Sequence, residues 1–123
     1  MNIFLIDDEY ISNFINRKLI ENIDSSLQVT EFSEPAIAYE HLQLTRPDLI
    51  FLDINMPVMT GWDFLDKMLH DGTEFKVVIL TSSVNKLDRA TAKNYKNVIG
   101  FLEKPATIAS VSPYISQLVS SET

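Results

Sequence analysis

The sequence predicts an α/β fold in which helices cover both faces of a parallel sheet. Two observations support this prediction. Short apolar runs alternate with segments of helical periodicity along the whole chain, five of each. Most of these runs are apolar at nearly every position, which is typical of strands that are buried on both faces. The 123 residues suit one domain with one continuous core, and no repeat or linker interrupts them.

The strands follow from these apolar runs. "NIFLI", "DLIFLD", "KVVILT" and "IGFLEK" are almost continuous, whereas "LQVTEF" alternates and predicts an outer strand. The expected strands are 2–6, 27–32, 48–53, 76–81 and 99–104.

The helices follow from apolar positions spaced three and four residues apart. The expected helices are 11–23, 34–45, 62–69, 85–95 and most of 105–123. The first helix should bury one stripe, made of Ile11, Phe14, Ile15, Lys18, Leu19 and Asn22. Ser33 is expected to cap the second helix, with Pro35 in its first turn and an inner face of Ala36, Tyr39, Leu42 and Leu44.

The last helix contains Pro113, which removes a backbone donor and clashes with the carbonyl one turn earlier. We therefore expect a kink there, or a restart with Ser112 as N-cap, rather than an unbroken helix. Its apolar stripe comprises Ile108, Val111, Ile115, Leu118 and Val119.

The composition excludes several classes of function. The net charge of −7 makes direct binding to nucleic acid improbable, because such proteins are usually basic. No apolar run spans a membrane, and the N-terminus does not resemble a signal peptide, so a cytoplasmic location is expected. The chain has no cysteine, which excludes disulfides, thiolate chemistry and cysteine-based zinc sites.

Polar residues stand where the predicted strands end. Asp7, Asp8 and Glu9 follow the first strand, Asp53 ends the third, Thr81 ends the fourth and Lys104 ends the fifth. Because parallel strands deliver their carboxyl ends to one edge, we expect these side chains to share a cleft. Clustered carboxylates hold protons or bind a cation, and oxygen ligands favour Mg²⁺, Mn²⁺ or Ca²⁺ over zinc. A site with few carboxylates suits Mg²⁺ handling phosphate, and Asp53 is a plausible phosphoryl acceptor.

The order of "LIDDE", "FLDINMPVMTG", "VILTS" and "FLEKP", each at a strand end, resembles the receiver domain of two-component response regulators. The resemblance covers essentially the whole chain. It implies a flavodoxin-like, three-layer, doubly wound sheet with strand order 2-1-3-4-5. It also implies a single receiver domain over 1–123, and because the sequence ends at residue 123, no output domain is expected.

The resemblance implies a role for each matching residue. Asp53 corresponds to the phosphoaccepting aspartate, Asp8 to the direct Mg²⁺ ligand and Asp7 to an acid that binds the ion through water. The backbone carbonyl of Asn55 would complete the protein ligands, and Mn²⁺ could replace Mg²⁺. The catalytic and switch residues of the family correspond to Lys104, Thr81 and Phe101, and the Lys104–Pro105 bond is expected to be cis.

The resemblance also implies partners. A histidine kinase or phosphotransfer protein would donate the phosphoryl group, and a downstream protein would read the face made by helix 85–95, strand 99–104 and the last helix. The domain would not be an enzyme beyond transfer to itself and autodephosphorylation. Two alternatives stay open: a haloacid-dehalogenase-like phosphohydrolase, whose Asp-x-Asp spacing differs from the adjacent Asp7 and Asp8, and a degenerate receiver that only binds.

Overall fold

A computed structural model describes residues 1–83 and 85–122. Five parallel strands form one sheet in the order β2-β1-β3-β4-β5, so the expected strand order is confirmed. The strands are β1 (Asn2–Ile6), β2 (Gln28–Phe32), β3 (Leu49–Leu52), β4 (Val77–Thr81) and β5 (Val98–Glu103). The helices are α1 (Tyr10–Ile23), α2 (Pro35–Thr45), α3 (Gly61–His70), α4 (Lys86–Ala92) and α5 (Ile108–Glu122).

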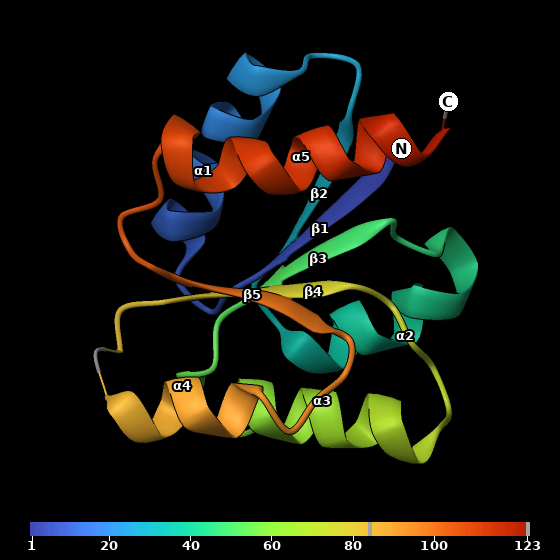
Figure 1. The fold of residues 1–123 in the computed structure, drawn as a ribbon. Helices are drawn as coiled ribbons and strands as arrows, with labels where there is room; N and C mark the ends of the chain where they lie inside the picture. Colours follow the sequence, from blue (N-terminus) through green and yellow to red (C-terminus); the bar gives the residue numbers. More distant parts are fainter. Residues whose placement is uncertain (84, 123) are drawn as a thin grey trace.

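The molecule has three layers, as Figure 1 shows: α1 and α5 cover one face of the sheet, and α2, α3 and α4 cover the other. Alternate side chains of the buried central strands therefore enter different cores. Phe4, Ile50 and Ile79 pack with α2 and α3, whereas Ile3, Phe51 and Leu80 pack with α1 and α5. This arrangement explains why β1, β3 and β4 are apolar at nearly every position.

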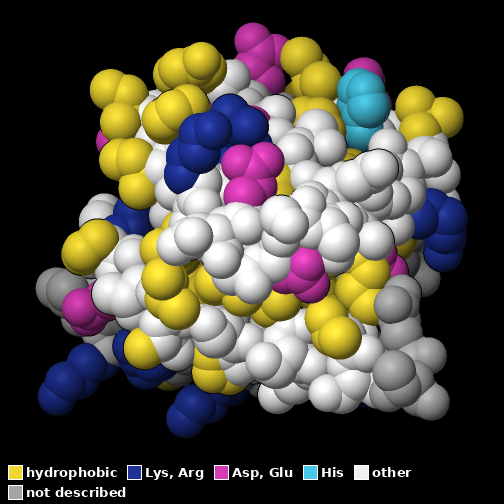
Figure 2. Space-filling model, turned by 90° about the horizontal axis from the view of Figure 1, so that it is seen from above, with side chains coloured by type: hydrophobic (Ala, Val, Ile, Leu, Met, Phe, Trp, Pro, Cys, Tyr) yellow, Lys and Arg dark blue, Asp and Glu magenta, His cyan; other side chains and the backbone are white. Residues whose placement is uncertain are grey.

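The predicted buried face of α1 is wrong. Ile11 and Ile15 are 70% and 58% exposed, whereas the buried residues are Asn13, Asn16 and Ile20. The helix is rotated so that the Asn13 amide donates hydrogen bonds to the carbonyls of Asp7 and Phe32. Hydrophobic periodicity cannot predict this orientation, because it considers only apolar positions. Hydrophobic side chains consequently remain exposed on the side of the molecule that Figure 2 views, which is the side of α1 and α5.

Three expectations about α2 and α4 also need correction. Glu34 rather than Ser33 is the N-cap of α2, and it makes no side-chain cap bond, because the ring of Pro35 already sets the first turn. Ala38 and Leu42 form the buried face, with Tyr39 packed beside them, whereas Ala36 and Leu44 are exposed. The fourth helix ends at Ala92, earlier than expected.

The α5 helix runs through Pro113 without a break, so the expected restart at Ser112 is wrong. Burial of Val111, Ile115 and Leu118 against the sheet holds the segment in one helix. Pro113 has no N–H to donate to the carbonyl of Ala109. Because Ala109 is exposed, that carbonyl can accept a hydrogen bond from water instead. Of the expected stripe, Ile108 and Val119 are exposed.

The start of α3 is fixed directly behind β3. Thr60 accepts a hydrogen bond from the Asp63 backbone and the Asp63 carboxylate accepts one from the Thr60 backbone, which forms a capping box. Gly61 is buried so close to β3 that an added Cβ would lie 2.6 Å from the Asp53 carbonyl oxygen. The connection that follows Asp53 is therefore held tightly at the edge of the sheet. Among the described residues, no helix has the length and apolarity needed to cross a membrane.

Candidate functional site at the carboxyl edge of the sheet

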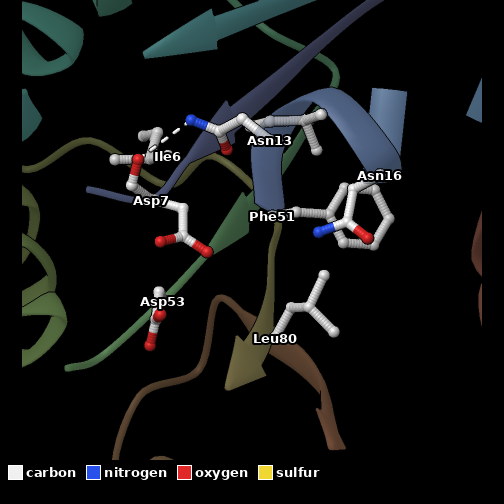
Figure 3. Close-up of a pocket in the computed structure, with 8 residues that line it drawn as sticks. Ile6, Asp7, Asn13, Asn16, Phe51, Asp53 and Leu80 are labelled. Carbon is white, nitrogen blue, oxygen red and sulfur yellow. Dashed lines mark hydrogen bonds between the residues drawn. The ribbon is translucent and has the colours of Figure 1, made fainter. Parts of the chain in front are cut away.

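The polar residues predicted from the strand ends meet at one edge of the sheet. Asp7 follows β1, Asp53 follows β3, Thr81 ends β4 and Lys104 follows β5. Asp7, Asp8 and Asp53 each place a carboxylate oxygen within 4.8 Å of the other two. Figure 3 shows the carboxylates of Asp7 and Asp53 next to each other beyond the ends of their strands. Both residues are buried, with exposed fractions of 4% and 3%.

Lys104 joins the two buried acids. Its ammonium group donates to Oδ2 of Asp7 and, at 2.9 Å, to Oδ2 of Asp53. Burial alone would lower the pKa of Lys104, but the hydrogen bonds and charges of Asp7 and Asp53 outweigh it and raise that pKa. The ammonium is therefore held in its charged form and offsets part of the repulsion between the carboxylates.

Asp8 is the acid of this cluster that Lys104 does not bind. Desolvation and then the negative charge of Asp7 raise the pKa of Asp8 above its usual value. The ionised Asp8 carboxylate is thus disfavoured in the protein alone, and a bound cation would relieve that penalty. Oxygen ligands without histidine or cysteine fit a hard divalent cation such as Mg²⁺.

Backbone donors orient the two buried carboxylates. The Asn55 N–H donates to Oδ1 of Asp53, and the Glu9 N–H donates to Oδ1 of Asp7, each over 2.9 Å. Each aspartate therefore closes a turn with the residue two positions later, and its Oδ2 faces Lys104. The adjacent loops thereby fix the direction of both acids.

Thr81 is completely buried, but its hydroxyl takes part in the same network. Its Oγ1 accepts hydrogen bonds from the side chain of Asn55 and from the Ser83 N–H, both over 3.2 Å. The sequence identified Asn55 only through its backbone carbonyl. The side chain that links the loop after β3 to the end of β4 was missed, because no pattern in the sequence records that contact.

Asn13 is a second residue that the sequence did not identify. Its buried amide donates to the carbonyl of Asp7 over 2.9 Å and to the carbonyl of Phe32 over 3.0 Å. It therefore ties the loop that carries Asp7 to the end of β2. The sequence did show an asparagine among the apolar residues of α1, which could have indicated a buried polar role. Its hydrogen-bond partners, however, become its neighbours only in the folded chain.

Phe101 lies apart from the acids, on β5, and is half-buried. The guanidinium of Arg89, from α4, lies 4.7 Å from the centre of its ring, a cation–π contact. The bond between Lys104 and Pro105 is cis, as expected.

The chain matches known proteins along most of its length. The sequence model of the response regulator receiver domain matches residues 3–115. A protein-glutamate methylesterase/protein-glutamine glutaminase 3 of Burkholderia thailandensis is 32% identical over 105 residues, and the cyclic di-GMP phosphodiesterase response regulator RpfG of Xanthomonas campestris is 31% identical over 107. Each match covers 85% of this chain but only 29% and 28% of the relative, so the chain spans less than a third of their length.

Solved structures show the same fold. A two-component response regulator from Legionella pneumophila has a TM-score of 0.85 at 24% identity, covering 98% of both chains. The chemotaxis protein CheY4 of Vibrio cholerae has a TM-score of 0.80 at 21% identity, covering 95% of this chain and 97% of its own. With the match of residues 3–115, these observations establish that the chain belongs to the response regulator receiver domain family, the signalling domain of two-component systems.

Proposed function

We propose that Asp53 accepts a phosphoryl group and that residues 1–123 act as one receiver domain. The observation that carries this proposal is the position of the Asp53 carboxylate, which is 3% exposed, oriented by the Asn55 N–H and bonded to the Lys104 ammonium. In the transfer, an Asp53 carboxylate oxygen forms a bond to phosphorus while the phosphorus–nitrogen bond of a phosphohistidine breaks. The bonding electrons leave with the imidazole, which then takes a proton.

The acidic cluster supports a role for Mg²⁺ in this reaction. Asp8, Asp53 and the carbonyl of Asn55 would hold the ion directly, and Asp7 would bind it through water; Mn²⁺ meets the same ligand requirements. A bound divalent cation supplies positive charge against the carboxylates and the phosphoryl oxygens. The raised pKa of Asp8 supports this assignment, because desolvation and the charge of Asp7 disfavour its ionised form and a bound cation would offset both.

Lys104 and Thr81 respond to the phosphoryl group in this proposal. Lys104, bonded to Asp7 and Asp53, transfers one of its hydrogen bonds to a phosphoryl oxygen. The Thr81 hydroxyl leaves the donors from Asn55 and Ser83 and turns toward another phosphoryl oxygen. Both movements replace hydrogen bonds of the unmodified protein by hydrogen bonds to the phosphoryl group. Phosphorylation therefore shifts the equilibrium from the resting arrangement of Lys104 and Thr81 to the one that binds the phosphoryl oxygens.

The change reaches a partner through the face made by α4, β5 and α5. Phe101 is the switch aromatic of this face: it lies on β5, and its ring contacts the guanidinium of Arg89 on α4. An open groove beside it combines the cations Arg89 and Lys93 with the apolar residues Val98 and Ile99. A histidine kinase or phosphotransfer protein would supply the phosphoryl group, and a downstream protein would bind this face.

The test is phosphorylation by a small donor. Incubation with acetyl phosphate and Mg²⁺, followed by intact-mass spectrometry, should give a single phosphoryl adduct that is absent with EDTA. Asp53→Asn should abolish the adduct, whereas Asp24→Asn, at the far end of α1, should retain it. An adduct that persists in Asp53→Asn, or steady turnover of phosphate esters well above background, would refute the proposal.

A further inference from the structure

A small space lies behind the acidic cluster, between α1 and the sheet. The volume open to the centre of a water molecule there is about 10 Å³. In Figure 3 Asp7 and Asp53 lie on one side of this space, and Asn16, Phe51 and Leu80 lie on the other. Its walls comprise Leu5, Ile6, Asp7, Asn13, Asn16, Phe51, Asp53 and Leu80.

The side chain of Asn16 borders this space and has no partner within the described residues. It is 8% exposed, and no hydrogen bond reaches its amide from residues 1–83 or 85–122. Asn13, one turn earlier on α1, differs because both protons of its amide are bound by backbone carbonyls. In Figure 3 the Asn16 amide nitrogen points to the side on which Asp7 and Asp53 lie. Among the described residues no fully buried side-chain nitrogen or oxygen lacks a hydrogen-bond partner, so the Asn16 amide is within reach of water, and a water molecule in this space would satisfy it.

The dimensions and chemistry of the space fit one water molecule. About 10 Å³ is close to the least volume that holds one water molecule, and it is too small for a larger ligand. A buried water needs two to four polar partners, and the walls offer the Asn16 amide and the carboxylates of Asp7 and Asp53. The carboxylate oxygens that accept from Glu9, Asn55 and Lys104 each retain a second lone pair.

We propose that this space holds one ordered water through which Asn16 bonds to the carboxylates of Asp7 and Asp53. Asn16 is then a positioning residue: it supports the acids from the side of the core, opposite the surface at which a cation would enter. The occupancy of the water follows from the pocket alone, whereas its effect on the cation rests on the Mg²⁺ role proposed above.

The expected effect of removing this support is a loss of Mg²⁺ affinity without a loss of stability. Asn16→Leu replaces the amide by an apolar side chain of similar size among Leu5, Phe51 and Leu80, so the midpoint of urea unfolding should stay the same or rise. Mg²⁺ affinity should fall about tenfold, the lower end of the effect of groups that orient metal ligands. Asn16→Ser should keep the affinity within about threefold, because a second water can replace the lost amide.

The experiment combines a crystal structure with calorimetry. The wild-type structure, at a resolution that shows ordered water, should contain one water bonded to Asn16 and to Asp7 or Asp53. Mg²⁺ titration should separate Asn16→Leu from the matched control Asn22→Leu, an exposed position on the same helix.

Three results would overturn the proposal: wild-type density without this water, an Asn16→Leu affinity within twofold of wild type, or an equal loss in Asn22→Leu. Should Asn16→Leu fail to fold, the wild-type structure still decides the water, and Asn16→Met, which also removes the amide, takes the place of Asn16→Leu in the Mg²⁺ titration. A wild-type protein that does not bind Mg²⁺ refutes the proposed function and the positioning role, while the crystal structure still decides the water.

Discussion

The contact between Lys104 and the two buried acids predicts a large effect of Lys104→Met on stability. The lysine side chain is 14% exposed, and it bonds to carboxylates whose side chains are 6% and 3% exposed. Methionine keeps much of the apolar stem but has no charge and no donor. The substitution therefore leaves Asp7 and Asp53 facing each other without their shared cation.

The expected cost is about 3 kcal/mol in the free energy of unfolding, measured at neutral pH without Mg²⁺. Removing one partner of a buried ion pair typically costs about 3–5 kcal/mol, and this site takes the lower end because it lies at an edge that water reaches beside Asp8. A domain of 123 residues has a total stability of roughly 6–18 kcal/mol, so the loss is a substantial fraction. The melting temperature should fall by about 10 °C.

Urea unfolding followed by circular dichroism in EDTA measures this loss. The matched control is Lys96→Met at an exposed position, which should change the unfolding free energy by no more than about 0.5 kcal/mol. The double variant Lys104→Met/Asp53→Asn should recover much of the stability, because one of the two carboxylates becomes neutral. A loss in Lys104→Met no larger than in Lys96→Met, or no recovery in the double variant, would refute the reasoning.

Three further predictions follow from other contacts. Asn13→Ala should lower the unfolding free energy by about 1–3 kcal/mol, because the Asp7 carbonyl loses its side-chain donor, while the Phe32 carbonyl keeps the Asp7 N–H; urea unfolding against Asn22→Ala checks this, and equal losses would contradict it. Val58 is fully exposed with φ of 68°, so Val58→Asn should raise the unfolding free energy by about 1 kcal/mol, and an unchanged urea midpoint would show that the residue is not strained. Desolvation and the carboxylates of Asp71 and Asp66 raise the pKa of Tyr39 and Tyr95 to about 12. Because folding favours their neutral forms, stability should fall as the pH rises from about 10 to 12. In a pH titration followed by tyrosinate absorbance, Tyr95→Phe should lose one tyrosine that ionises at high pH. Loss of a tyrosine that ionises at about pH 10 would contradict this.

The pattern of the sequence was sufficient for the type and order of the elements. Apolar runs of four to six residues indicate strands buried on both faces, and that property does not depend on which helix covers which face. The same pattern located Asp7, Asp53, Thr81 and Lys104 at strand ends, and parallel strands bring such ends to one edge. The gathering of these four residues at one edge follows from the order and the direction of the strands. Both can be predicted from the sequence.

The orientation of individual helices and the connections between side chains depended on the tertiary structure. Hydrophobic periodicity predicted the wrong buried side for α1, because it treats Asn13 and Asn16 as surface residues. In the structure both are buried: Asn13 donates to backbone carbonyls, and Asn16 borders the space beside Asp7 and Asp53. Pro113 predicted a kink or a restart, and the burial of α5 against the sheet overrides the restart. The bonds of Lys104 to Asp7 and Asp53 span 97 and 51 residues, and no local pattern encodes contacts over such separations. The sequence therefore determined which groups reach the edge, and packing in three dimensions decided which of them bind one another.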